Sequence, residues 1–108
     1  MHKVLWHPKA REAVRGFPKE VKNEIGYLLF RLQKGDQLGM PHSRPIKAVM
    51  SGVGELRVRG TDGIYRAFYY VKTDMGVLVF HAFKKKDQKT PKREIEAGRK
   101  NLKESLYG

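Results

Sequence analysis

The stretch GELRVRGTDGIYRAFYYV, residues 54–71, contains two strand-like runs that are joined by a short turn. Residues 60–63, Gly-Thr-Asp-Gly, suit a two-residue hairpin turn. Such a turn places Arg57 directly opposite Arg66. Like charges that face each other across strands destabilise a sheet unless acidic groups or a bound anion compensate them. Glu55 lies near enough on the same face to be the acidic partner.

Further elements on both sides of this hairpin predict an α+β fold. Apolar residues recur at helical spacing between residues 18 and 34 and predict one buried stripe on that helix. The expected order is a strand over 2–7, helices over 8–16 and 18–34, strands over 55–60, 64–73 and 76–84, and a helix over 91–106.

This order, β-α-α-β-β-β-α, predicts a mainly antiparallel sheet with its helices packed on one face, which leaves the other face for function. Residues 36–54 show no clear periodicity and are expected to form a loop. Thr90 and Pro91 are expected to supply the N-cap and first turn of the last helix.

Composition favours a polyanionic partner. The 108 residues include 23 Lys and Arg against 11 Asp and Glu, for a formal net charge of +12. Solubility of a small domain needs a net charge of only about 2–8, so the excess favours nucleic acid or an acidic protein as partner. There is no cysteine, which excludes disulfides and thiolate metal sites. The length predicts a single domain, 1–108, and without a long apolar run we expect a cytoplasmic protein that does not contact a membrane.

Strand alternation puts the arginines of the hairpin on one face. Arg57, Arg59 and Arg66 share this face, and the planar guanidinium group suits phosphate recognition. Phe68 and Tyr70 share it as well and are candidates for stacking on exposed bases. The alternative is an ordinary solvated sheet face.

A second basic group follows the last strand. Lysines at 84, 85, 86 and 89 lie just before the last helix, where a bound phosphate is favoured by the helix dipole. A plain lysine-rich loop is the alternative. Arg44 and Lys47 add positive charge in the predicted loop.

The four histidines, at 2, 7, 42 and 81, are scattered and predict no metal site. Among them His81 lies near the basic strands, and regular alternation places it on the face opposite to Lys84. A two-residue turn at 74–75 puts His81 opposite Phe68, whereas a three-residue turn puts Lys84 opposite Arg66.

Three segments carry a family resemblance: ELRVRG (55–60), YRAFYYV (65–71) and GVLVFHAFKKKDQKTPKREIEAGRK (76–100). In this order and spacing they resemble the RelE/HigB-like toxins of bacterial type II toxin–antitoxin modules, especially the phage-derived HigB-like branch. The resemblance extends over nearly the whole chain and implies one RelE-like domain over residues 1–108.

The resemblance also implies an activity. Proteins of this kind are mRNA endoribonucleases (mRNA interferases) that inhibit translation, in many members on the ribosome, and they need no metal or other cofactor. The 2′-hydroxyl of the RNA attacks the adjacent phosphate, so the protein orients the strand and stabilises the anionic transition state. A cognate antitoxin, expected to be a helix-turn-helix DNA-binding protein, holds the toxin inactive.

By position the resemblance assigns roles to the basic residues. It implies that Arg57 and Arg66 contact the scissile phosphate and that a lysine among 84–86 stabilises charge or protonates the leaving oxygen. The expected catalytic residues are Arg57, Arg66, Lys84 and Lys85, and the expected RNA-binding residues are Arg44, Lys47, Arg59, Lys86 and Lys89. The general base stays open between a lysine and His81.

Two other functions remain open. A non-catalytic nucleic-acid-binding module would use the same basic face only to bind phosphates. A degenerate toxin would retain only the binding of a partner protein.

Overall fold

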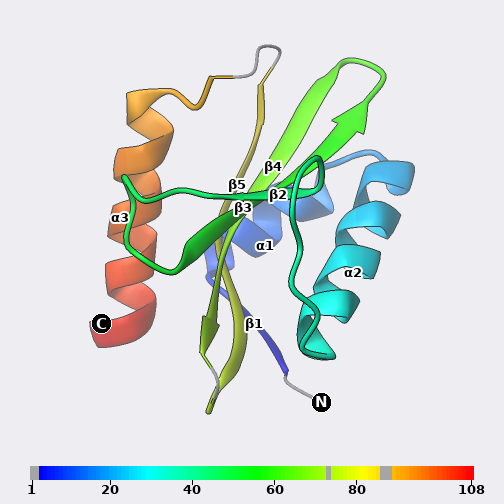
Figure 1. The fold of residues 1–108 in the computed structure, drawn as a ribbon. Coiled ribbons are helices and arrows are strands. Elements are labelled where there is room, and N and C mark those ends of the chain that lie inside the picture. The colour runs from blue at the N-terminus through cyan, green and yellow to red at the C-terminus, as the bar shows by residue number, and fades with distance from the viewer. Residues whose placement is uncertain (1–2, 73, 86–88) are drawn as a thin grey trace.

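The computed structural model describes residues 3–72, 74–85 and 89–108 (Figure 1). In chain order the elements are β1 (Val4–Trp6), α1 (Pro8–Arg15), α2 (Lys19–Gln33), β2 (Ser43–Pro45), β3 (Val53–Gly60), β4 (Gly63–Lys72), β5 (Gly76–Lys85) and α3 (Lys92–Tyr107). None of the helices in these described ranges is long and apolar enough to span a lipid bilayer.

The strands form one sheet in the order β1-β5-β4-β3-β2. The three long strands make an antiparallel meander, β2 pairs antiparallel with β3, and β1 pairs parallel with β5. The predicted α+β class and the mainly antiparallel sheet are thereby confirmed. Gly60 pairs with Gly63, so the first hairpin has the two-residue turn that its sequence predicts, and Arg57 does lie opposite Arg66.

The short strand β2 was not predicted, because we expected only a loop over residues 36–54. Its three residues end at Pro45 and leave no room for a visible alternation of apolar and polar positions. Proline is tolerated there because β2 is an edge strand. The strand matters for function because it brings Arg44 beside Glu55.

Helix α2 buries the predicted apolar stripe and ends where the sequence predicts. Gly35 adopts a positive φ of 95°, and its N–H donates to the carbonyl of Leu32. The N–H of Asp36 donates to the carbonyl of Arg31, which completes a Schellman motif. The polar segment that follows α2 is thereby directed back toward the edge of the sheet.

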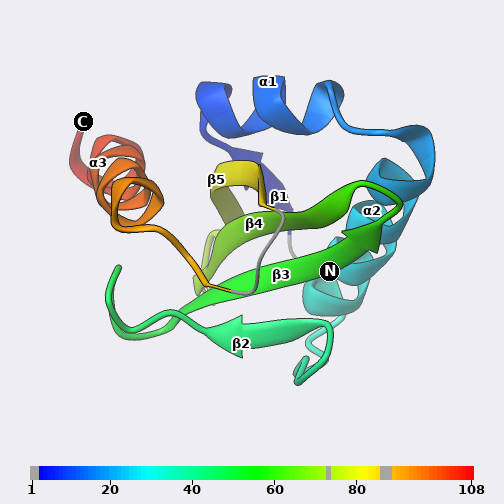
Figure 2. The same cartoon turned by 90° about the horizontal axis from the view of Figure 1, so that it is seen from above.

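The helices cover both faces of the sheet, so the prediction that they all pack on one face is wrong. Helices α1 and α2 pack on a core that contains Leu56, Val58 and Tyr65. Helix α3 packs through Leu102 on the opposite face, against a second core that contains Phe68. Figure 2 shows α2 and α3 on opposite sides of the strands.

A glycine permits α3 to approach the sheet closely. A Cβ atom added at Gly98 would lie 2.7 Å from Cδ2 of Phe68. Consequently Phe68 is fully buried beneath α3, and the suggestion that it stacks on exposed bases is wrong.

The pairing of β4 with β5 contains a bulge. Lys72 pairs with Gly76, and an irregularity between Phe68 and Tyr69 shifts the register by one residue. As a result His81 lies opposite Phe68, which was the first of the two predicted alternatives, although the bulge rather than a two-residue turn produces it.

The N-terminal part of the chain is tied to the end of α3. Nδ1 of His7 accepts a hydrogen bond from the N–H of Lys9 and so caps α1. Nε2 of His7 lies 2.8 Å from the carboxylate of Glu104. This hydrogen bond lowers the pKa of the Glu104 carboxyl group below its ordinary value.

Candidate functional site

Opposed residues of neighbouring strands share a face of the sheet, so the register aligns the candidate site residues in three rows across its second face. Each row runs from β5 through β4 to β3, and the first continues to β2. The rows are His81, Phe68, Glu55 and Arg44; Phe83, Arg66 and Arg57; and Lys85, Ile64 and Arg59.

A buried carboxylate lies at the centre of these rows. Glu55 is fully buried, and its Oε1 accepts a hydrogen bond of 2.9 Å from Nε of Arg44. Nε of Arg57 and Nη1 of Arg66 each lie 3.7 Å from the same carboxylate. The sequence-based expectation that Glu55 compensates the opposed arginines is confirmed.

Thr90 connects this cluster to the start of α3. Its hydroxyl donates to Oε2 of Glu55 at 3.0 Å, and it accepts from Arg44 at 3.0 Å and from Arg66 at 2.9 Å. The N-cap position of α3 is Pro91, without a side-chain cap, so the prediction that Thr90 caps this helix is wrong. The hydroxyl instead makes hydrogen bonds with Arg44, Arg66 and Glu55. We call Arg44, Glu55, Arg57, Arg66 and Thr90 the arginine cluster.

The three arginines of the cluster differ in their access to solvent. The side chain of Arg66 is fully buried, that of Arg57 is 9% exposed, and that of Arg44 is 32% exposed. The carbon Cζ of Arg66 lies 6.0 Å from the ring centroid of Phe83. Arg66 therefore supports its neighbours from beneath, while Arg57 and Arg44 are the members that a ligand from solvent can reach.

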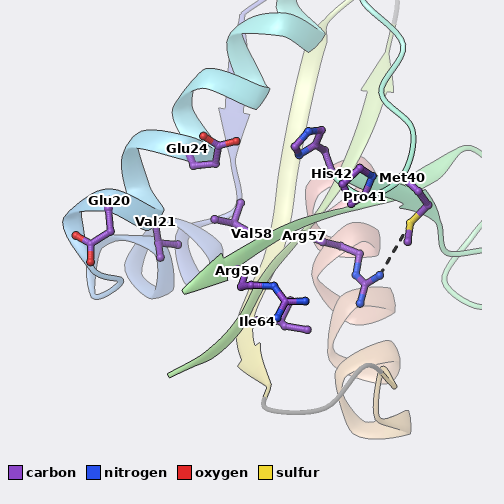
Figure 3. Close-up of a pocket in the computed structure, with 10 residues that line it drawn as sticks. All are labelled: Glu20, Val21, Glu24, Met40, Pro41, His42, Arg57, Val58, Arg59 and Ile64. Atoms are coloured by element: carbon purple, nitrogen blue, oxygen red, sulfur yellow. Dashed lines mark hydrogen bonds between the residues drawn. The ribbon is translucent and has the colours of Figure 1, made fainter. Parts of the chain in front are cut away.

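A cleft of about 570 Å³ opens beside Arg57. It lies between α2, the segment before β2 and the end of β3, as Figure 3 shows. The backbone N–H of Arg57 donates to the carbonyl of His42 at 2.8 Å, and this bond holds one rim against the strand. The lining residues are Glu20, Val21, Glu24, Met40, Pro41, His42, Arg57, Val58, Arg59 and Ile64.

His81 does not line this cleft. Its Nε2 lies 2.8 Å from Oε1 of Glu94, and its Nδ1 lies 3.4 Å from Nδ2 of Asn101. These contacts fit the tautomer that carries its proton on Nε2. The ring also packs against those of Phe68 and Phe83, at centroid distances of 5.4 Å to each. His81 thus fastens α3 to the sheet behind the arginine cluster.

Lys84 points to the other face of the sheet. Its Nζ lies 3.1 Å from Oδ2 of Asp62 and 6.0 Å from the ring centroid of Tyr65. Hydrogen bonds from Tyr65 and Lys84 lower the pKa of the Asp62 carboxyl group, and the bond to Asp62 raises the pKa of Tyr65. The structure therefore does not bring Lys84 together with Arg66.

The other expected basic residues lie in three different segments of the chain. Lys85 ends the row that contains Arg59, and Lys89 is exposed directly before Thr90. Lys47 is exposed in the segment after β2. Lys86 lies outside the described residues. Among the residues that the structure does describe, no three His, Asp or Glu side chains gather as a potential metal site.

The sequence did not identify several residues of the site. Thr90 was expected to cap a helix, His42 was considered only as a metal ligand, and the cleft residues Glu20 and Glu24 were not considered. The i, i+4 spacing of the two glutamates predicts that they share a face of α2, but nothing in it predicts that β3 lies opposite them. That neighbour follows from the packing of α2 on the sheet.

Comparison with known proteins gives a family. Residues 12–103 match the family described as phage-derived, Gp49-like proteins. No curated protein sequence matches the chain significantly. Because the match spans most of the 108 residues, the chain belongs to the phage-derived Gp49-like family, a family of RelE/HigB-like toxins.

Proposed function

We propose that this protein is the toxin of a type II toxin–antitoxin module and acts as an mRNA endoribonuclease. The observation that carries the proposal is the arginine cluster, in which three guanidinium groups are held on one buried carboxylate beside an open cleft. Groups that are fixed before the substrate binds stabilise developing negative charge without reorganising.

In the proposed reaction the 2′-hydroxyl of the RNA attacks the adjacent phosphate, and the bond from phosphorus to the 5′ oxygen breaks. Arg57 contacts the phosphate, because, of the opposed residues Arg57 and Arg66, only Arg57 has a side chain that reaches solvent. Arg66 acts as a positioning residue from beneath. Lys85 is the lysine of the predicted catalytic pair that lies on the same face and is proposed to assist the leaving oxygen.

The remaining basic residues are proposed to bind the RNA backbone on either side. Arg59 extends from the cleft, Arg44 and Lys47 extend from the β2 side, and Lys89 extends from the α3 side. Lys86 was assigned the same role from the sequence. Their spread allows several successive phosphates to be neutralised, as expected for a single-stranded substrate.

Proton transfer has a candidate that the sequence did not suggest. His42 lines the cleft with Arg57, whereas His81 is engaged by Glu94 and Asn101. Imidazole is the side chain that most often exchanges protons in catalysis near neutral pH. We therefore propose His42 as the general base, in preference to His81.

Two partners complete the proposal. The substrate is mRNA, bound on the ribosome, and the inhibitor is an antitoxin that neutralises the basic face. The expected antitoxin is a helix-turn-helix DNA-binding protein. A net charge of +12 is consistent with both an RNA substrate and an acidic inhibitory segment.

The test is cleavage of a defined mRNA by the purified protein, with and without ribosomes, followed by mapping of the new 5′ ends. Arg57→Ala is expected to lower the cleavage rate by about 10²–10³-fold. Arg57→Lys checks that charge alone is insufficient, and Arg11→Ala on the exposed side of α1 is the matched control. Unchanged cleavage by Arg57→Ala, with its fold verified by circular dichroism, refutes the assignment.

A non-catalytic RNA-binding module is the second candidate. The complete burial of Arg66 favours it, because a buried guanidinium group does not contact the phosphate that would be cleaved. In that case no new 5′ ends form under any condition. Arg57→Ala then only weakens RNA binding and reduces its dependence on salt.

A further inference from the structure

Helix α2 has a second face, which points away from the core. Its buried residues are Val21, Ile25, Leu28, Leu29 and Leu32. On the other side of the helix, exposed residues recur three and four positions apart, which is the spacing of a face that packs on another helix. They are Lys19, Asn23, Gly26, Tyr27, Phe30 and Lys34. We call these six residues the outer face of α2, and Figure 1 shows this helix at the periphery of the fold.

Two large aromatic side chains lie next to each other on the outer face. Tyr27 is 55% exposed and Phe30 is 43% exposed. They are three positions apart, so they belong to adjoining turns of the helix and form one patch. Aromatic residues contribute a large share of the binding free energy in protein interfaces. The patch therefore favours contact with another molecule.

Gly26 leaves a notch in the middle of this face. A glycine inside a helix is less favourable than alanine. Among the described residues, nothing lies within 4 Å of a Cβ atom added at Gly26, so the packing of this chain does not require glycine there. The contrast is Gly98, where an added Cβ atom meets Phe68 at 2.7 Å. Glycine permits the backbone of another element to approach closely, and at Gly26 this approach is open to another molecule.

The outer face is positively charged at both ends. Lys19 begins α2, where the helix dipole disfavours a cation, and Lys34 follows its last residue. Nζ of Lys34 lies 5.3 Å from the ring centroid of Phe30, which keeps this charge beside the aromatic patch. None of the six residues is acidic, and the neighbouring Glu20 lines the cleft beside Arg57 instead. The charges therefore favour a partner with acidic groups at both ends of the contact.

We infer that the outer face of α2 binds an acidic amphipathic helix of a partner protein. A small residue of the partner helix meets Gly26, its apolar side chains contact Tyr27 and Phe30, and its carboxylates pair with the two lysines. The inference is independent of the proposed function, because the outer face contains no residue of the arginine cluster.

A second copy of this chain fits the outer face less well. If two copies of α2 crossed antiparallel at Gly26, Lys34 of one copy would lie near Lys19 of the other. A parallel crossing would bring identical lysines together. Each copy also carries a net charge of +12. Like charges in contact oppose such a pair.

RNA is the other acidic ligand that lysines and aromatic residues attract. Phosphates and stacked bases need neither the helical spacing of the face nor a glycine at its centre. Both features are explained by a helix that packs closely on α2. The observations therefore favour a protein partner.

The test measures the binding of stapled helical peptides to the full chain by fluorescence anisotropy at a fixed salt concentration. The first peptide carries alanine at its centre, leucine one turn to either side, and glutamate at both ends of the same face. The second carries lysine in place of glutamate, and the third carries tryptophan in place of the central alanine. The staple holds all three helical, so their affinities report the contact and not helix formation.

The acidic peptide is expected to bind, and the lysine and tryptophan peptides to bind about tenfold more weakly. Tyr27→Ser/Phe30→Ser is expected to weaken binding of the acidic peptide by about 10–100-fold. Gly26→Gln fills the notch and is expected to weaken binding about tenfold while raising the thermal stability of the free protein, which excludes a folding defect as the cause. Tyr107→Ser, which changes an exposed tyrosine on α3, is the matched control and is expected to bind like the wild type.

Three results overturn the inference: no binding of the acidic peptide, equal binding of the acidic and lysine peptides, or binding that Gly26→Gln leaves unchanged. Sedimentation velocity of the protein alone is expected to show a monomer. A dimer that Tyr27→Ser/Phe30→Ser dissociates assigns the face to a second copy and also overturns the inference, as does a loss of RNA binding without a loss of peptide binding in that variant. The proposed function is tested separately by mRNA cleavage, which these substitutions are expected to leave unchanged.

Discussion

The hydroxyl of Thr90 donates a hydrogen bond of 3.0 Å to the buried carboxylate of Glu55, across 35 residues of chain. This bond joins the segment that leads into α3 to the middle of β3. It also places Thr90 where it accepts from Arg44 and Arg66. The position of the arginines therefore depends on a connection between two parts of the fold.

Glu55→Gln tests the charge balance of the arginine cluster. The substitution keeps the shape of the side chain but removes the negative charge that faces three guanidinium groups. Leaving buried charges without their partner costs about 3–5 kcal/mol. Urea unfolding should show a loss of this size, whereas Glu96→Gln on the exposed side of α3 should change little. A loss below about 1 kcal/mol would contradict the stabilising role of Glu55.

Thr90→Val removes the hydroxyl and keeps the volume. Because the hydroxyl bonds with Glu55, Arg44 and Arg66, we expect a loss of about 1–3 kcal/mol in the free energy of unfolding. Thr90→Ser retains the hydroxyl and should lose far less. Thermal unfolding of the pair provides the comparison, and equal effects of Val and Ser would show that the methyl group matters instead.

Gly98→Ala and Gly26→Ala should shift stability in opposite directions. At Gly26 a Cβ atom meets nothing within 4 Å, so alanine is expected to stabilise α2 by about 0.5–1 kcal/mol. At Gly98 it meets Phe68 at 2.7 Å, and the resulting overpacking is expected to cost about 1–3 kcal/mol.

The measurement for the two glycines is chemical denaturation of both variants beside the wild type. Gly98→Ala/Phe68→Leu should recover part of the loss if the clash is its cause. A stabilising effect of Gly98→Ala would mean that α3 does not pack as closely on the sheet as the structure shows.

The stabilising contribution of Glu104 should be lost in acid. Its folded-state pKa is lowered from the ordinary value of 4.5 by the hydrogen bond from His7. Its contribution is therefore complete above that value and is lost as pH falls through the lower, folded-state pKa. Urea unfolding between about pH 7 and pH 3 should show the difference between wild type and Glu104→Gln shrinking toward the acid end. A difference that stays constant over this range would refute the linkage.

Lys84 and Lys85 should differ in their effect on RNA cleavage. Lys85 belongs to the row that contains Ile64 and Arg59, whereas Lys84 is bound to Asp62 on the opposite face. We expect Lys85→Ala to slow cleavage more than Lys84→Ala does, while Lys84→Ala should loosen the first hairpin. Cleavage rates on mRNA, with hydrogen exchange of the hairpin amides, separate the two effects. A larger loss of activity in Lys84→Ala would return the catalytic role to that residue.

The sequence by itself determined the local elements and the central hairpin. The helical spacing of apolar residues predicted the buried stripe of α2, and Gly35 predicted where the helix ends. Both signals act over a few neighbouring residues. The two-residue turn between Gly60 and Gly63 set the pairing of Arg57 with Arg66 and placed Glu55 beside them. Register follows from turn length, so this part of the site was accessible without tertiary information.

Only the tertiary structure decided which face α3 covers and which segments lie next to the arginines. Packing of α3 depends on the close approach of Gly98 to Phe68, a contact between residues 30 positions apart. The cleft depends on α2 lying beside the end of β3, and Thr90 reaches Glu55 through the path of the segment before α3. Such neighbours arise from the fit of side chains in three dimensions, which leaves no periodic signal in the sequence.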